Sequence, residues 1–291
     1  MSNHNLLCMY IINTRKFDQL GDQDYNLYSS KEENIMKLVK AYLLAIIALI
    51  MVSAPASANS VLHQILSSGV LQAGTTGDFY PFSKRDTATN GYEGFDIDVL
   101  TELAKDMDVD IEFVATDWKT LVAGVVAGNY VITGSAGIQA KRMKAAGYSD
   151  SYMSVVVKAY TTEDDISRFD SWDSINQSGV KVATTLGTTF EKNAENWFPN
   201  SKLTKIEAPA RGYQEVLAGR SQVFITSNVE GGTLLSKYPN LREIPVAGRN
   251  PTPLAMLVPQ ADQVWINYVN HWIKIKRAKG FFAATAAKYG L

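Results

Sequence analysis

From residue 61 to the end of the chain, the spacing between hydrophobic positions switches repeatedly between two periods. A period of two over about four to eight residues is typical of strands, whereas apolar positions three or four apart are typical of helices. In the first half the pattern predicts helices over 61–68, 97–104, 118–127 and 140–146, with strands over 70–75, 111–114 and 130–133. In the second half it predicts strands over 155–160, 180–183, 205–206, 223–226, 243–246 and 255–258, helices over 171–175, 190–198, 211–218 and 230–238, and a closing helical region over 260–287.

Local sequence signals support these predicted elements. They also recur at matching places in the first and second halves of the chain. Asp96 precedes a helical row of apolar residues, which is typical of an N-cap and of an acidic first turn. Gly128 and Gly219 each end a helix at matching places in the two halves. Alternating strands and helices predict an α/β fold with mainly parallel sheets, built as two lobes. Ligands of such folds bind outside the carboxyl ends of the strands, so we expect the site in a cleft between the lobes.

An export signal precedes the first predicted helix. Lys37 and Lys40 form a short positive region, residues 41–52 are all apolar, and Ala56-Ser57-Ala58 has the pattern of a signal-peptidase site. The apolar run is shorter than the roughly 20 residues that a transmembrane helix needs. This segment therefore predicts a signal peptide over 36–58 that is cleaved after Ala58, and a product that is exported to the periplasm and does not span a membrane when mature.

Residues 1–35 are polar and irregular, and they precede the predicted signal peptide. Because such a peptide normally begins at the N-terminus, we expect Met36 to be the true initiator and residues 1–35 to be a mis-assigned extension. Cys8 would then be absent from the protein.

Composition excludes several classes of function. The net charge is −1, which does not indicate a nucleic-acid-binding protein. The single Cys and three widely spaced His residues offer neither a disulfide nor a typical zinc site, so we expect no metal and no cofactor.

Six sequence blocks occur in a characteristic order along the exported part. They are ILSSGVLQAGTTGDFYPFS (65–83), GYEGFDIDVLTELAKDM (91–107), TDWKTLVAGVVAGNY (116–130), KRMKAAGYSDSYM (141–153), LGTTFEK (186–192) and AGRSQVFITSNVE (218–230). Together they resemble the family 3 extracytoplasmic solute-binding proteins, the polar amino-acid receptors of ABC importers. TTGDFYPFS and the Trp118 segment are most similar to the cyclohexadienyl (prephenate/arogenate) dehydratase branch, an enzyme group on the same fold.

The resemblance implies a two-lobe, type II periplasmic binding protein-like fold with a discontinuous first lobe. The first lobe would comprise 59–157 and 252–291, the second 158–251, with crossing strands near 155–160 and 252–257. The lobes would close around a ligand like a hinged clamp. A monomer that delivers a small organic acid or amino-acid-like ligand to an ABC permease is implied.

A carboxylate site is the first chemical expectation. Arg142 matches the family arginine, and a guanidinium binds a carboxylate through two parallel hydrogen bonds. Ser135, at a predicted strand end and turn, would add hydroxyl and backbone donors. Thr188 and Thr189 begin a helix after Gly187, and the free N–H groups of a helix N-terminus favour an anion. Each of these residues also has an ordinary structural interpretation, as a surface charge, a turn residue or a helix cap.

Side chains at the end of the first strand would shape the rest of the cleft. Asp78 and Phe79 follow that strand, and Trp118 would form a wall beside them. Phe82 is a weaker candidate of the same kind, because core packing explains buried aromatic residues equally well.

Two positions depart from the amino-acid receptors. Ser227 stands where those receptors carry the aspartate that binds the ligand's ammonium group, and Gln222 replaces an acidic residue earlier in the same segment. A buried ammonium without a carboxylate is costly. The ligand could therefore be a carboxylate without an ammonium group, a zwitterion held by aromatic residues, or an amine bound by Asp78 or Glu230.

The role of Glu191 distinguishes two hypotheses about function, a receptor and an enzyme. By position it matches the residue that acts as general acid in the dehydratase branch, where it would protonate a departing hydroxyl as the ring loses CO₂. Plain receptors also carry a glutamate here, and a first-turn glutamate stabilises a helix. We favour a solute-binding receptor, and keep an exported prephenate/arogenate dehydratase as the alternative.

Overall fold

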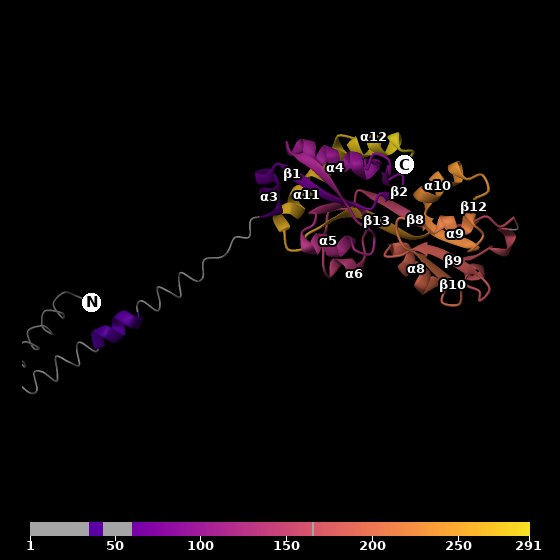
Figure 1. The fold of residues 1–291 in the computed structure, drawn as a ribbon, viewed down its shortest axis with the longest axis horizontal. Helices are drawn as coiled ribbons and strands as arrows, with labels where there is room; N and C mark the ends of the chain where they lie inside the picture. Colours follow the sequence, from indigo (N-terminus) through magenta and orange to yellow (C-terminus); the bar gives the residue numbers. More distant parts are fainter. Residues whose placement is uncertain (1–34, 43–59, 165) are drawn as a thin grey trace, which may run out of the picture. The chain divides into compact units, whose positions relative to one another are not determined.

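In this computed structural model, residues 60–291 form a central sheet with helices packed around both of its ends (Figure 1). The structure describes residues 35–42, 60–164 and 166–291. Residues 35–42 form a helix, whereas the rest of the predicted signal peptide and the predicted extension lie outside the described residues. No helix in the described ranges has both the length and the apolar character that crossing a membrane requires.

Within residues 60–164 and 166–291 the strands form a ten-stranded main sheet and a small three-stranded sheet. The main path runs β10 (Lys202–Ile206), β9 (Lys181–Thr185), β11 (Val223–Ser227), β8 (Met153–Thr161), β13 (Arg249–Val258), β6 (Ile132–Gly137), β1 (Val70–Thr75) and β5 (Asp110–Ala115), with β12 (Arg242–Glu243) on β8 and β7 (Gly147–Tyr148) on β13. The small sheet contains β2 (Asp78–Phe79), β3 (Ser83–Arg85) and β4 (Tyr92–Glu93).

The two halves of the main sheet are parallel, as the alternating pattern predicted. β1 pairs in parallel with β5 and β6, and β9 pairs in parallel with β10 and β11. The long strands β8 and β13 pair antiparallel with each other between these halves, with Val155 opposite Thr252. These are the segments expected to cross between the lobes. Residues 59–291 pack as one compact unit, so the lobe bounds remain a prediction.

Helices cover both ends of the sheet (Figure 1). Beside the β1 half lie α3 (Val61–Ser68), α4 (Phe95–Asp106), α5 (Leu121–Ala127), α6 (Ala140–Met143), α11 (Gln263–Ala278) and α12 (Phe281–Lys288). The β9 half carries η1 (Ile166–Arg168), α7 (Trp172–Ile175), α8 (Thr189–Trp197), α9 (Tyr213–Leu217) and α10 (Asn228–Lys237).

Most predicted elements are present, and two local predictions are wrong. The N-cap of α4 is Gly94, not Asp96, and Asp96 is buried in the first turn. Gly94 suits that place because its φ of 136° is favourable only for glycine, and a Cβ there would lie 2.4 Å from the Phe82 carbonyl oxygen. Residues 134–137, expected to form a turn, continue strand β6.

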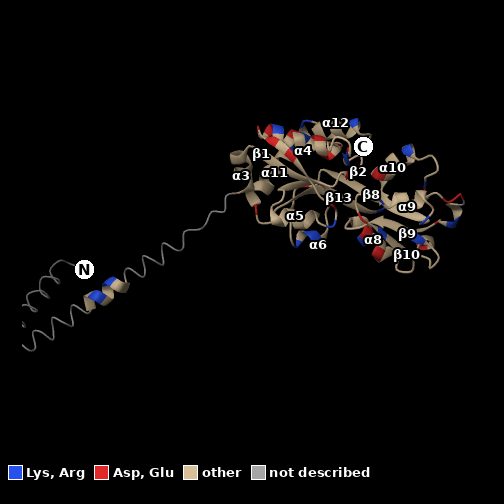
Figure 2. Cartoon of the chain, viewed as in Figure 1, with Lys and Arg blue, Asp and Glu red and all other residues tan. Residues whose placement is uncertain are grey.

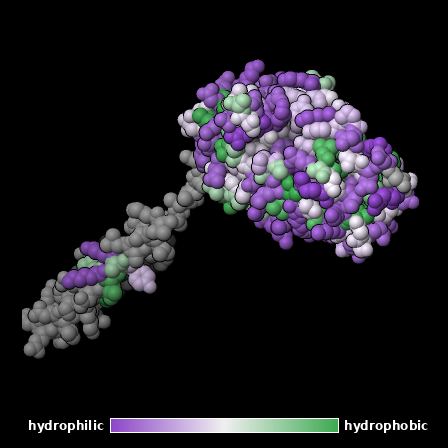
Figure 3. All heavy atoms as spheres, turned by 45° about the vertical axis from the view of Figure 1, so that its right-hand side comes forward, coloured by the Kyte–Doolittle hydropathy of each residue, from purple (hydrophilic) through white to green (hydrophobic). Residues whose placement is uncertain are grey.

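The closing helical region is divided at Gly280. On α11, Trp265, Val269 and Ile273 are fully enclosed. Outside the core, basic and acidic side chains are interspersed over the helices (Figure 2), in keeping with the small net charge. Hydrophobic residues form small separate groups on the face shown in Figure 3.

Candidate functional site

Six of the predicted site residues line one cavity where the two halves of the sheet meet. The cavity measures about 10 Å³, roughly the space of one water molecule. Its lining consists of Phe79, Trp118, Ser135, Gly137, Arg142, Thr188, Thr189, Phe190, Arg211 and Leu254. We call it the Arg142 cavity.

Arg142 is the charged centre of this cavity. The short helix α6 holds its side chain inward, so that only 6% of the residue is exposed. Nη1 donates to the Gly137 carbonyl over 3.2 Å, and Nη2 donates to the Gly187 carbonyl over 3.0 Å. Within the described part of the chain, no salt bridge joins this guanidinium to a carboxylate. A buried positive charge with only neutral partners favours the binding of an anion.

The opposite wall is the N-terminus of α8. Thr188 is its N-cap: the hydroxyl accepts a hydrogen bond from the Glu191 N–H over 3.2 Å and donates to the Thr185 carbonyl over 2.6 Å. Thr189 is the first helical residue, so its N–H is among those that lack a partner within the helix. The positive end of this helix therefore lies on the same cavity as Arg142.

Two glycines let these walls approach each other. A Cβ on Gly187 would lie 2.6 Å from the backbone nitrogen of Lys119, and Gly187 has a φ of 79°. A Cβ on Gly137 would lie 2.7 Å from Cγ2 of Thr189. Real Cβ atoms do not approach other atoms so closely, so larger residues would push the two walls of the Arg142 cavity apart.

Ser135 connects the cavity to a buried carboxyl group behind it. Its hydroxyl donates to Asp96 Oδ1 over 2.8 Å, the Tyr152 hydroxyl donates to the same oxygen over 2.9 Å, and the Ser135 N–H donates to the Tyr152 oxygen. Burial raises the pKa of Asp96 to about 7, although these hydrogen bonds oppose the shift. Because Ser135 uses its own proton on Asp96, its hydroxyl can meet a ligand as an acceptor.

Aromatic rings form the remaining wall. Phe79 and Trp118 meet edge to face with their ring centroids 5.6 Å apart, and Phe190 lies 6.4 Å from Phe79. Phe82 stacks on Phe79 at 4.8 Å but is fully buried and does not line the Arg142 cavity. Phe82 therefore supports the wall from behind, as the core interpretation predicted.

Asp78 lies on a different and larger cavity. This cavity of about 830 Å³ is also lined by Glu230, Tyr80, Tyr213 and Lys237. Asp78 accepts a hydrogen bond from Trp118 Nε1 over 2.9 Å and lies 3.3 Å from Nη1 of Arg211. Its carboxylate is therefore occupied by groups of the protein itself.

Arg211 is a buried charged residue of this region that the sequence did not single out. Its Nε and Nη2 atoms donate to the two oxygens of Glu230 over 3.0 and 2.6 Å, and its side chain is only 4% exposed. Burial lowers the pKa of Arg211, but the adjacent carboxylates of Glu230 and Asp78 more than offset this effect, so its pKa lies above its ordinary value. No local pattern marked this residue, because its partners are 19 and 133 positions away.

Ser227 has a structural role in this arrangement. It is buried at the end of β11 and is the N-cap of α10, where its hydroxyl accepts a hydrogen bond from the Glu230 N–H over 3.0 Å. It does not line the Arg142 cavity or the 830 Å³ cavity. The hydroxyl of Thr226 also contacts Glu230, so β11 positions that carboxylate for Arg211.

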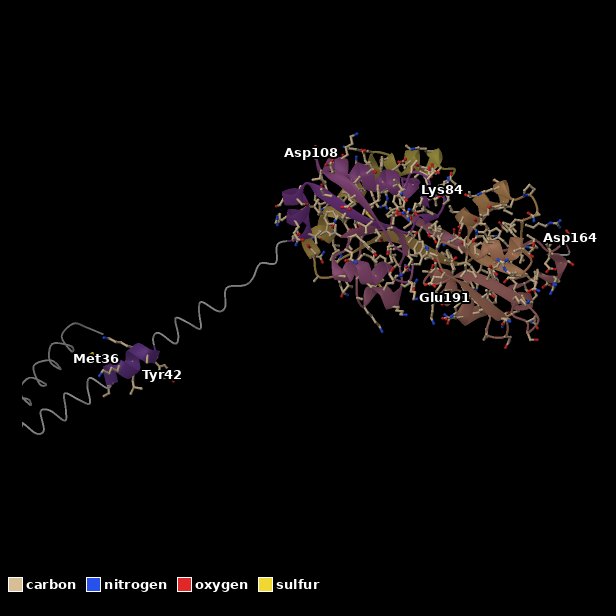
Figure 4. All side chains as sticks on the ribbon, in the orientation of Figure 1. Met36, Tyr42, Lys84, Asp108, Asp164 and Glu191 are labelled. Atoms are coloured by element: carbon tan, nitrogen blue, oxygen red, sulfur yellow. The ribbon has the colours of Figure 1, made fainter. Side chains whose placement is uncertain are left out.

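Glu191 lies in the first turn of α8 (Figure 4). Its Oε2 accepts a hydrogen bond from the Gly187 N–H over 2.7 Å, and its Oε1 lies 3.0 Å from Lys205 Nζ. The side chain is 16% exposed and is not part of the lining of the Arg142 cavity. Both oxygens thus contact donor groups of the protein itself.

Comparisons with known proteins agree with this architecture. The cyclohexadienyl dehydratase of Pseudomonas aeruginosa is 28% identical over 81% of this chain and 88% of its own length. The lysine/arginine/ornithine-binding periplasmic protein of Escherichia coli is 27% identical over 72% of this chain and 78% of its own length. The crystal structure of an ancestral amino acid-binding protein, described as a precursor of cyclohexadienyl dehydratase, is 30% identical, with a TM-score of 0.74 over 79% of this chain and 99% of its own.

These relatives confirm the type II periplasmic binding protein fold and the family expected from the six sequence blocks. Residues 71–291 match the model of one family over most of the chain. The chain belongs to the bacterial extracellular solute-binding proteins, family 3.

Proposed function

We propose that this solute-binding protein captures a small, carboxylate-bearing, amino-acid-like metabolite, whose carboxylate binds Arg142, and delivers it to an ABC importer. The observation that carries the proposal is the buried guanidinium of Arg142, which donates to two backbone carbonyls and has no carboxylate partner among the described residues. A ligand carboxylate would compensate this charge and could receive two parallel hydrogen bonds.

Further groups around Arg142 support a ligand of this kind. Thr188 and Thr189 bring the positive end of α8 to the same anion. Ser135 faces a ligand as an acceptor, which suits an N–H or O–H donor next to the carboxylate, as in an amino or hydroxy acid. Phe79 and Trp118 would pack on the apolar part of the ligand.

Closure brings these groups together from both halves of the sheet. Arg142 of α6 contacts Gly187, which precedes α8, so the anion site is complete only when the halves meet. A ligand that bridges them would stabilise the closed form by its differential affinity. An ABC permease would then recognise the closed protein.

The place of action follows from the family and the N-terminal segment. Proteins of this family are extracellular, and we propose that the signal peptide over 36–58 is cleaved after Ala58 to release a monomer into the periplasm. The small net charge and the mixed surface charges are compatible with a soluble receptor of this type (Figure 2).

The alternative is an exported cyclohexadienyl dehydratase in which Glu191 is the general acid. It is favoured by the Pseudomonas aeruginosa relative and by the position of Glu191 in the first turn of α8. A general acid must present a proton to the leaving group. The two oxygens of Glu191 instead accept from Gly187 and Lys205, which favours the receptor.

One experiment tests the two functions together. The purified protein is mixed with prephenate, and phenylpyruvate is followed by its absorbance; in parallel, its melting temperature is measured with a panel of amino acids, organic acids and betaines. The receptor predicts no turnover and a higher melting temperature with at least one carboxylate. Turnover that Glu191→Gln abolishes would replace the receptor with the enzyme.

A further inference from the structure

Arg211 separates the two cavities of the site. In the described part of the chain it is the single residue that lines both the Arg142 cavity and the 830 Å³ cavity. Its backbone precedes α9, and its side chain reaches across to Asp78 of β2. Any ligand group that extended from Arg142 toward the larger cavity would therefore meet this guanidinium.

The surroundings of Arg211 have the chemistry of a cation-binding subsite. Two carboxylates, Asp78 and Glu230, form charge-assisted hydrogen bonds with it, and the bidentate pair with Glu230 has the planar geometry that a guanidinium prefers. The guanidinium carbon lies 5.6 Å from the centroid of the Phe79 ring, which adds a cation–π contact. Two negative charges face one positive charge in a buried place.

We propose that Arg211 is a tethered counter-cation that occupies a cation subsite built for a guanidinium or ammonium group, and that it thereby determines specificity. This inference rests on the proposed binding function of the cleft. Because the Arg211 side chain already fills the cation subsite, the protein binds carboxylate ligands that lack a second cationic group. It excludes ligands with basic side chains. Removing the Arg211 side chain converts the cleft into a receptor for organic cations.

The electrostatic argument predicts the direction of that change. In Arg211→Ala, the carboxylates of Asp78 and Glu230 stay buried without a counter-charge, which is strongly unfavourable. The deleted side chain also leaves a space that joins the 830 Å³ cavity to the Arg142 cavity. A small guanidinium compound can enter that space and restore the three lost hydrogen bonds.

The test is chemical rescue measured by thermal unfolding. Melting temperatures of wild type, Arg211→Ala and Arg220→Ala are compared with and without millimolar methylguanidinium, which carries no carboxylate. Arg220 is the matched control, because it forms a bidentate pair with Glu215 but at an exposed position. We expect Arg211→Ala to melt lower than wild type and to gain at least about 3 °C with methylguanidinium, while wild type and Arg220→Ala do not respond.

A second variant, Arg211→Gln, provides the same test if Arg211→Ala folds poorly. Arg211→Gln removes the charge but keeps an N–H donor for Glu230, and we expect it to be stabilised by methylguanidinium as well. If neither variant is stabilised, or if wild type responds equally, the inference is wrong. Failure of both variants to fold even with the probe present would also overturn it.

L-Arginine distinguishes this inference from the proposed function. Its carboxylate can bind Arg142 while its guanidinium fills the vacated subsite, so Arg211→Ala should bind L-arginine at least about ten times more tightly than methylguanidinium. Rescue by methylguanidinium with no gain from L-arginine would support the cation subsite and contradict the carboxylate site. A gain from L-arginine without any methylguanidinium rescue would contradict the subsite.

Discussion

Nη2 of Arg142 lies 3.0 Å from the carbonyl oxygen of Gly187, so a guanidinium carried by α6 contacts the chain just before α8. This contact joins the two halves of the sheet at the cavity. It also leaves the charge of Arg142 without a carboxylate in the described part of the chain. A neutral carbonyl compensates a buried cation only in part, which leaves room for a stronger interaction with a ligand anion.

Arg142→Gln should therefore have opposite effects on binding and on stability. We expect the affinity for a carboxylate ligand to fall at least about 30-fold, because a buried charge-paired hydrogen bond is lost. The ligand-free protein should melt at the same temperature or higher, since an uncompensated buried charge has been removed. Calorimetric titration and thermal unfolding measure the two effects.

Lys141→Gln is the control for that prediction. It removes the same charge one residue earlier on α6, at an exposed position. We expect its ligand affinity to stay within about twofold of wild type, because exposed charges contribute little. Equal loss of affinity in both variants would show that the net charge of the region matters rather than a direct contact.

Gly187→Ala should prevent close contact between the walls of the Arg142 cavity. The added Cβ would lie 2.6 Å from the Lys119 nitrogen, and alanine is strained at a φ of 79°. Gly219→Ala has nearly the same strain, at a φ of 68°, with no atom within 4 Å. We expect Gly219→Ala to lose about 1 kcal/mol of stability, Gly187→Ala to lose more because of the added clash, and only Gly187→Ala to lose ligand affinity. If Gly219→Ala weakens binding as much, close approach at Gly187 is not what binding requires.

Asp96 should make stability depend on pH. Its pKa is raised from 3.8 to about 7 by burial, so the folded protein holds this proton while the unfolded chain has released it. The stabilisation is complete below about pH 4 and is lost as pH rises through about 7, by at most about 4 kcal/mol.

Asp96→Asn tests that sign, because its amide keeps an acceptor oxygen for Ser135 and Tyr152 without titrating. Denaturant unfolding of both proteins is measured from pH 4 to pH 8. The wild type should lose stability relative to Asp96→Asn as pH rises. A constant difference between the two would show that Asp96 does not titrate in this range.

The N-terminus of the exported protein tests the predicted processing. When the full chain is expressed in a Gram-negative host, mass spectrometry of the periplasmic fraction should find a protein that begins at Asn59. Replacement of Ala58 by a bulky residue should block cleavage, since the site requires small side chains. A periplasmic protein that retains residues 1–35 would contradict the proposed start at Met36.

The sequence predicted the elements of the fold better than their ends. The pattern located α3, β1 and β8, but local signals placed Asp96 at the N-cap of a helix where Gly94 is the cap. Small residues were interpreted as a turn at 134–137, whereas pairing of β6 with β13 makes this segment a strand. Pairing between distant segments leaves no mark in a local pattern.

In the candidate site, too, residues within local motifs could be predicted, and contacts between distant segments could not. Arg142, Thr188 and Trp118 came from motifs with local spacing, and they line one cavity. The pairing of Asp78 and Glu230 with Arg211 could not be predicted, because it depends on loops that meet only in the folded chain. That ion pair also removes one of the three ligand possibilities, an amine bound by either carboxylate, unless the amine displaces Arg211.

The central claim is that Arg142 binds the carboxylate of a small metabolite, and paired ligands test it most directly. Thermal unfolding of the purified protein is measured with a panel of amino and hydroxy acids and with the corresponding amides, which lack the carboxylate. We predict that at least one acid raises the melting temperature by about 3 °C or more, that its amide does not, and that Arg142→Gln abolishes the response. Equal stabilisation by acid and amide, or an undiminished response in Arg142→Gln, would contradict the claim.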